Sequence, residues 1–148
     1  MKRINQKGFT LVELLAVIAL LALLTTIAVP NVLSTINNNK RNSFLLDAKR
    51  MITKAESLLT REIRNDLITN STTMTYDFAT LNQNGEFPSD PDSSGNTYQN
   101  GYVKVNYDTT NQVFKYCLYL KGARRTIGTS GACVDSTLLT GIDVVKEL

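Results

Sequence analysis

The stretch that decides the fold is residues 7–30, which read KGFTLVELLAVIALLALLTTIAVP. Between Phe9 and Val29 the sequence contains one charged residue, Glu13. A helix of this length is about 30 Å long, which matches the hydrocarbon thickness of a bilayer. A cleavable secretory signal has a shorter apolar region of about 7–15 residues. The pattern therefore predicts a helix that can span a membrane rather than an ordinary secretion signal.

Pro30 closes the apolar stretch and predicts a weak point in the helix. Proline lacks a backbone N–H and clashes with the preceding turn, so we expect a kink or a local break there. The residues just before it, from Thr25 to Val29, are mostly β-branched and form helix less readily than the leucine and alanine run ahead of them.

A second helical stretch is predicted beyond Pro30 because apolar residues recur at steps of three and four. The apolar face holds Leu45, Ala48, Ile52, Ala55, Leu59 and Ile63. We expect the opposite, charged face to be solvated; it holds Lys40, Lys49, Arg50, Lys54, Glu56, Arg61 and Glu62. Polar residues take over between Ile68 and Ser71, where the helix is expected to fray.

The C-terminal part of the chain has the pattern of a small sheet. Residues 82–101 are rich in Asn, Asp, Ser, Gly and Pro and predict a long loop. Two alternating runs follow, Tyr102 to Tyr107 and Val113 to Leu120, which fit an antiparallel hairpin with a five-residue connection, Asp108 to Gln112.

Two further segments complete the predicted topology. Arg124 to Thr129 is a candidate third strand, and the tail from Leu138 to Leu148 is ambiguous between strand and short helix. One long helix, a loop and then a small antiparallel sheet belong to the α+β class.

The net charge of +3 is confined to the start of the chain. Lys2, Arg3 and Lys7 are three of the sixteen basic residues, so residues 9–148 carry thirteen basic and thirteen acidic side chains. A basic leader directly before an apolar run is typical of a targeting segment whose charged end stays in the cytoplasm.

The chain contains no histidine and two cysteines, Cys117 and Cys133. Both cysteines follow the apolar segment, on the side of a membrane where a disulfide is stable, and closing that loop would stabilise the domain by roughly 3 kcal/mol. Two unpaired buried thiols are the alternative. The absence of histidine removes the commonest general base and metal ligand, so we expect no enzymatic activity and no cofactor.

A basic leader ending in Gly8, an aromatic Phe9, a lone Glu13 four residues later and Pro30 at the far end of the helix resemble the type IV pilin and pseudopilin family. The resemblance covers about the first 30 residues. It implies cleavage between Gly8 and Phe9 by a prepilin peptidase on the cytoplasmic side, followed by N-methylation of Phe9. It also implies loosening of the helix from Ala22 to Pro30 in a filament.

Glu13 is the residue whose placement needs an explanation, because a carboxylate in an apolar helix costs about 2.5–3.5 kcal/mol on insertion scales. In the resembled family the glutamate of one subunit meets the amino terminus of its neighbour, which would set the axial register during assembly. A side chain that merely reaches the membrane interface is the alternative.

The resemblance implies a division into a leader (1–8), a transmembrane or filament-core helix (9–30) and a globular head with the amphipathic half of the helix (31–148). The implied partners are other pilin subunits, including minor pilins, the prepilin peptidase, an assembly ATPase, a membrane platform protein and, before assembly, membrane lipid. The precursor would be a single-pass protein of the cytoplasmic membrane, and the mature subunit part of a surface filament for adhesion, motility, secretion or DNA uptake.

Two weaker patterns lie in the head. Asp90, Asp92 and Ser94 match the first positions of a calcium loop, but Gly101 stands where the bidentate glutamate belongs. Nucleic-acid binding is not expected from a neutral mature chain; its candidate contacts are Arg124, Arg125, Tyr116 and Tyr119.

One function of a different class stays open, a single-pass anchored binding domain that never polymerises. The carboxylate of Glu13 argues against it, since a plain anchor gains nothing from a charge among leucines.

Overall fold

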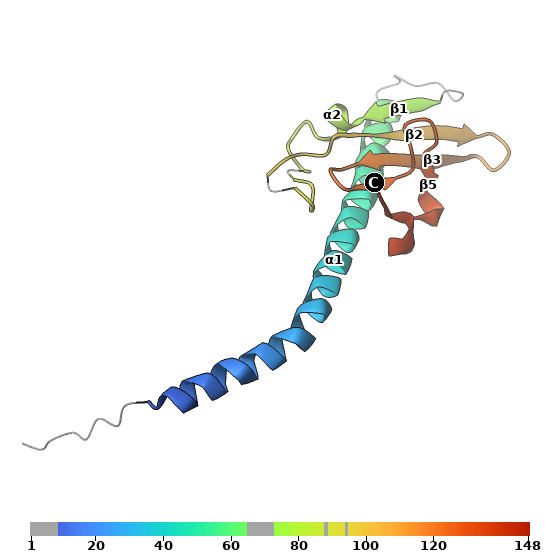
Figure 1. Cartoon of the computed structure of the whole chain (residues 1–148). Coiled ribbons are helices and arrows are strands. Elements are labelled where there is room, and N and C mark those ends of the chain that lie inside the picture. Colours follow the sequence, from blue (N-terminus) through green and yellow to red (C-terminus); the bar gives the residue numbers. More distant parts are fainter. Residues whose placement is uncertain (1–8, 65–72, 88, 94) are drawn as a thin grey trace, which may run out of the picture. The chain divides into compact units, whose positions relative to one another are not determined.

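The computed structural model describes residues 9–64, 73–87, 89–93 and 95–148 (Figure 1). The chain divides into two compact units, residues 1–37 and residues 38–148. Helix α1, Leu11–Arg64, belongs to both units. The second unit, residues 38–148, is the head.

Helix α1 is continuous through Pro30, so the local break predicted there is wrong. Proline is tolerated there although it has no N–H to donate to the carbonyl of Thr26, four positions earlier. Just before the proline, the hydroxyls of Thr25 and Thr26 donate to the carbonyls of Ala22 (2.9 Å) and Leu23 (2.7 Å). Such bonds share carbonyls with the helical ladder and weaken it slightly. The expected weak point therefore lies inside one uninterrupted helix.

In the part of the chain that the structure describes, the head is an antiparallel sheet of six strands with the C-terminal part of α1 packed on one face (Figure 1). Its elements are β1 (Met74–Asp77), α2 (Phe78–Leu81), β2 (Asn100–Asp108), β3 (Val113–Lys121), β4 (Arg125–Ile127), β5 (Val134–Asp135), η1 (Ser136–Leu138), η2 (Ile142–Val144) and β6 (Lys146–Glu147). The strand order is β1-β2-β3-β4-β6, and β5 pairs with β3. The predicted α+β class is confirmed.

The core of the head lies between α1 and the sheet. The sheet contributes alternate residues of its central strands, including Val103, Val105, Leu118 and Leu120. Ile63, which belongs to the predicted apolar face, is 42% exposed and lies outside the core. The stripe buried on α1 is also wider than predicted, because a helix against a sheet buries more than one row of side chains; it holds Phe44, Leu45, Ala48, Met51, Ile52, Ala55, Leu58 and Leu59.

The predicted hairpin is confirmed, with β2 three residues and β3 one residue longer than the alternating runs indicated. Asp108 pairs with Val113, which shortens the connection to the four residues 109–112. The Asp108 carboxylate accepts from the Thr110 N–H (2.9 Å) and pairs with Lys115 (2.7 Å). The hydrogen bond from Lys115 is the largest of the effects that hold the pKa of Asp108 well below its ordinary value.

The remaining segments fit the sequence less closely. The third strand predicted at Arg124 to Thr129 is the short β4, and the ambiguous tail holds both helical turns and the strand β6. Strand β1 was missed, because four residues next to a turn carry little alternation to detect. The described part of helix α1 extends to Arg64, and the fraying predicted between Ile68 and Ser71 lies outside the described residues.

Candidate functional site

The first turn of α1 is closed by a reciprocal pair of hydrogen bonds between Thr10 and Glu13. The Glu13 N–H donates to the Thr10 hydroxyl (3.2 Å), and the Glu13 carboxylate accepts from the Thr10 N–H (2.9 Å). The Thr10 hydroxyl also donates to the same carboxylate oxygen, Oε2, at 3.0 Å. This capping box satisfies two of the donors that every helix start leaves unpaired. It fixes the start of the helix immediately after Thr10.

The acidic side chain has a second reason to sit in this first turn. The unpaired N–H groups at a helix start carry a partial positive charge, which favours a carboxylate there. Within the described residues, both capping bonds to the carboxylate end on Oε2, so Oε1 can accept from a further donor. Glu13 is therefore satisfied within its own chain and still able to bind a cation.

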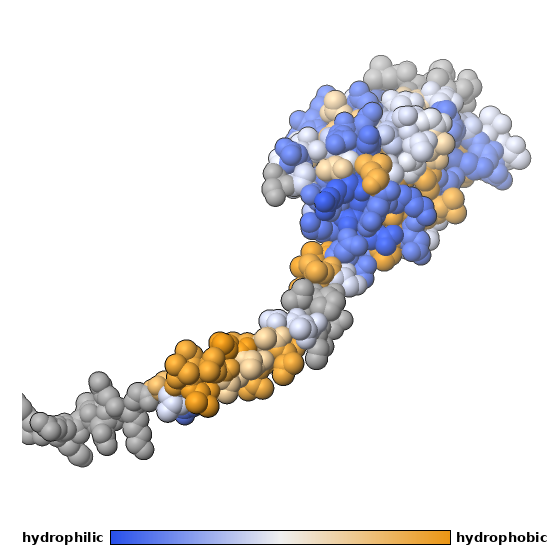
Figure 2. Space-filling view, in the orientation of Figure 1, coloured by the Kyte–Doolittle hydropathy of each residue, from blue (hydrophilic) through white to orange (hydrophobic). Residues whose placement is uncertain are grey.

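Apolar side chains are exposed on every face of the helix after this cap, and Figure 2 shows one of these faces. Their exposed fractions lie between 49% and 75% for Leu11, Val12, Leu14, Leu15, Val17, Ile18, Leu20, Leu21, Leu23 and Leu24. A helix that is apolar on every face is stable only when other apolar matter covers it. This segment therefore needs apolar matter from beyond itself to cover it.

Among the residues that the structure describes, no helix is both long enough and apolar enough to cross a membrane. The membrane span predicted for residues 9–30 is not confirmed.

Phe9, Thr10 and Glu13 lie together at the beginning of α1. Phe9 precedes the helix and is 89% exposed, so both its backbone and its ring are accessible. Gly8 lies outside the described residues, and Pro30 lies nearly five turns further along α1. Thr10 is the residue that the sequence analysis missed, although the spacing Thr-x-x-Glu before an apolar run is the sequence signature of a capping box.

A family model describes this part of the chain. Residues 3–29 carry the prokaryotic N-terminal methylation motif. This motif is the class III signal of type IV pilins and pseudopilins, which agrees with the resemblance seen in the sequence. No curated protein and no solved structure matches the chain. The methylation motif covers the capping box and the exposed apolar residues and leaves the head unassigned.

The head that follows the methylation motif is fastened by a disulfide between Cys117 and Cys133. Cys117 lies in the middle of β3, and Cys133 comes directly before β5, a strand of two residues that pairs with Cys117 and Leu118. Two pairs of residues are too few to hold a strand on a sheet by themselves. The predicted disulfide is present and supports the attachment of β5 to β3.

Removing the disulfide is expected to lower the free energy of unfolding by about 3 kcal/mol, because the denatured chain regains the entropy of a loop of this size. Urea unfolding of the Cys117→Ser/Cys133→Ser variant, followed by circular dichroism, measures this change. Wild-type protein in excess reductant is the matched control and should unfold at the same urea concentration. Equal stability of oxidised and reduced wild type would contradict the prediction.

Asp90 and Asp92, the acidic candidates for a calcium loop, are engaged in holding the loop before β2. Asp90 is 1% exposed and accepts from the N–H groups of Asp92 (3.0 Å) and Ala123 (2.5 Å). Asp92 forms an ion pair with Arg125, which is 3% exposed. Ser94 lies outside the described residues, and the part of the chain that is described contains no cluster of three or more potential metal-ligating side chains. Through these contacts both carboxylates hold the loop before β2 against the β3–β4 turn and β4.

Two of the residues considered for a nucleic-acid surface are buried in the head. Arg125 faces inward to Asp92 and Tyr119 is 5% exposed, so neither is available to bind nucleic acid, whereas Arg124 is exposed.

Gly122 is packed against the Asp90 carboxylate, where a Cβ atom would lie 2.6 Å from Oδ2 and 2.8 Å from the ring of Phe44.

Gly122→Ala is therefore expected to destabilise the head by about 1–3 kcal/mol through overpacking. Thermal unfolding of the variant measures the loss. Gly131→Ala is the matched control, since a Cβ at Gly131 meets no atom within 4 Å. A Gly122→Ala variant as stable as the control would show that the Asp90 carboxylate can move aside without loss of stability.

Proposed function

We propose that this chain is a structural subunit of a type IV pilus or a related filament. It would be made as a precursor held at the membrane by its N-terminal segment. A prepilin peptidase would cut after Gly8 on the cytoplasmic side, and Phe9 would then be N-methylated. The subunits would assemble through α1 into an extracellular or surface filament, driven by an assembly ATPase and a membrane platform protein.

One observation carries this proposal: a helix apolar on every face that begins with a capped carboxylate, inside a prokaryotic N-terminal methylation motif. The apolar surface accounts for burial against lipid before assembly and against other helices afterwards, because both environments exclude water from the same side chains. The motif points to a structural protein rather than an enzyme.

The carboxylate of Glu13 favours a subunit that polymerises over a membrane-anchored domain that does not. Cleavage would create an amino group on Phe9, a residue exposed at the helix start. In a filament the Oε1 oxygen of Glu13 could accept from the Phe9 amine of a neighbouring copy while Oε2 keeps its bonds to Thr10. A misaligned subunit would leave both charges buried and unpaired, which is strongly unfavourable. The pair would thus select one axial register.

Intact mass spectrometry of protein sheared from the cell surface tests the proposal. The expected mass is that of a chain beginning at Phe9 with one added methyl group and an intact disulfide. A chain beginning at Met1, or its absence from the sheared fraction while it remains in membranes, would instead favour the non-polymerising anchor.

A further inference from the structure

We propose that the C-terminal segment, residues 139–148, opens and closes as a unit separate from the rest of the head, and that Arg41 of α1 holds it closed. The inference goes beyond the proposed function, because it concerns a conformational change within one head and does not depend on filament assembly. All the residues involved belong to residues 38–148.

Arg41 reaches from α1 to the C-terminal segment. Its Nη2 donates to the carbonyls of Ile142 (3.1 Å) and Val145 (3.0 Å), which are 101 and 104 positions further along the chain. Hydrogen bonds from an ionised donor are stronger than those between neutral groups. Arg41 comes one turn before Phe44, the first core residue of α1 in the described chain. The contact therefore extends the hold of the head on α1 beyond the apolar core.

The other attachments of the C-terminal segment are few. Among the residues that the structure describes, its buried side chains are those of Leu139 and Val145. Strand β6 pairs with β4 through two residue pairs, and the Leu148 N–H donates to the carbonyl of Arg124 (2.9 Å). Strands β2 and β3, in contrast, are joined by nine residue pairs. A segment with so little buried surface and so short a ladder opens at a lower free energy than the central strands.

The guanidinium of Arg41 is incompletely satisfied in the closed form. Its Nε is buried and has no hydrogen-bond partner within the described residues. A buried donor without a partner is unfavourable, and it regains a hydrogen bond to water once it is exposed. Two charge-assisted bonds thus favour closure and one unsatisfied donor opposes it, which reduces the free-energy difference between the closed and the open form.

Opening of the C-terminal segment would expose groups that the closed form covers. The apolar side chains of Leu139 and Val145 would leave the core, and β4 would lose its pairing with β6. Unpaired backbone groups along a strand, next to apolar side chains, are what a strand from another chain binds. Closure by Arg41 therefore keeps this side of β4 from pairing with other chains.

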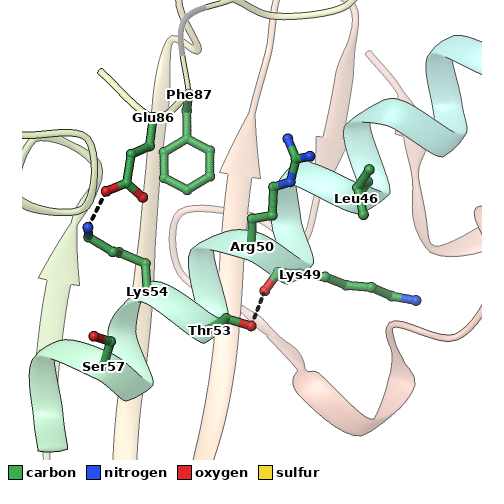
Figure 3. Close-up of a pocket in the computed structure, with 8 residues that line it drawn as sticks. All are labelled: Leu46, Lys49, Arg50, Thr53, Lys54, Ser57, Glu86 and Phe87. Carbon is green, nitrogen blue, oxygen red and sulfur yellow. Dashed lines mark hydrogen bonds and ion pairs between the residues drawn. The ribbon is translucent and has the colours of Figure 1, made fainter. Parts of the chain in front are cut away.

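Lys49 of the same helix provides a matched control. The loop before β2 is attached to α1 by the ion pair of Lys54 with Glu86 and by the buried ring of Phe87 (Figure 3). The side chain of Lys49 is exposed and points away from these residues. Replacing Lys49 therefore removes a cation from α1 without touching the attachment of the loop or of the C-terminal segment.

Amide hydrogen exchange of the full-length chain in detergent micelles tests the inference. In the wild type, the amides of Val145 and Leu148 are expected to exchange at least about tenfold faster than the hydrogen-bonded amides of β2 and β3. Arg41→Met keeps the apolar stem of the side chain and removes its donors. It is expected to speed exchange in the C-terminal segment by about a further tenfold and to leave β2 and β3 unchanged. Lys49→Met should exchange as the wild type does.

Three results would overturn the inference. Equal exchange rates in the C-terminal segment and in the central strands of the wild type would show that the segment does not open separately. Unchanged exchange of the segment in Arg41→Met would show that Arg41 does not hold it closed. Exchange that speeds up equally throughout the head of Arg41→Met would show that Arg41 stabilises the whole head rather than this segment.

Discussion

Replacing Gly8 with alanine is expected to leave the precursor uncut, with less than about a tenth of the chain in mature form. Glycine gives the protease an unhindered backbone that can adopt extended conformations, and a methyl group restricts both properties. The capping box starts the helix after Thr10, so Phe9, the residue that follows the scissile bond, precedes the helix. Mass spectrometry of the membrane fraction should show the chain beginning at Met1.

Asn5→Ala is the matched control for this experiment. It changes the leader three residues before the glycine and leaves the scissile bond intact, so processing should be as in the wild type. Normal maturation of Gly8→Ala would remove the cleavage site from the proposed mechanism, even if filaments still formed.

Replacing Glu13 with alanine is expected to leave cleavage intact but to reduce filament yield by more than about tenfold. Loss of one partner of a buried ion pair costs about 3–5 kcal/mol, because the amine of the neighbouring Phe9 would then be buried without a counter-charge. The variant also loses the bonds from Thr10 that cap α1. Quantifying the mature subunit in the sheared fraction and in membranes measures both processing and assembly.

Two further variants separate the charge from the cap. Glu13→Gln keeps an oxygen that can accept from the Thr10 N–H but removes the negative charge, so it should assemble as poorly as the alanine variant. Thr10→Ala keeps the charge and removes the hydroxyl of the cap, which typically costs about 1 kcal/mol, and should assemble better than either. Full assembly of Glu13→Gln would show that capping, rather than pairing with an amine, is what Glu13 provides.

The helices and strands differ in how well the sequence predicted them. The hairpin was predictable because its alternation is long, and the disulfide because two cysteines permit one intramolecular pair. Strand β1 and the turns η1 and η2 were not, since segments of two to four residues are held by tertiary partners and carry no period of their own. The prediction of a local break at Pro30 was wrong for a different reason, because a long helix can remain continuous when one backbone hydrogen bond is missing.

The tasks of Asp90, Asp92 and Arg125 were invisible in the sequence. Asp90 and Asp92 read as part of a calcium loop, and Arg125 read as a surface cation. In the fold, the β3–β4 turn brings the Ala123 N–H to Asp90 and the arginine to Asp92. Partners more than 30 positions apart cannot be recognised from local spacing. Asp90 and Asp92, which resemble part of a calcium loop in the sequence, instead hold the loop before β2 against the β3–β4 turn.

The sequence by itself determined the N-terminal segment: its charges, its apolar length, the methylation motif and the position of Glu13 all follow from local order along the chain. Tertiary structure alone decided how wide a stripe of α1 is buried, how β5 is attached to β3 and which residues hold the loop before β2. A helix start and an apolar run depend on neighbours a few residues away. A surface arises from residues brought together by packing, and a single sequence does not record those distances.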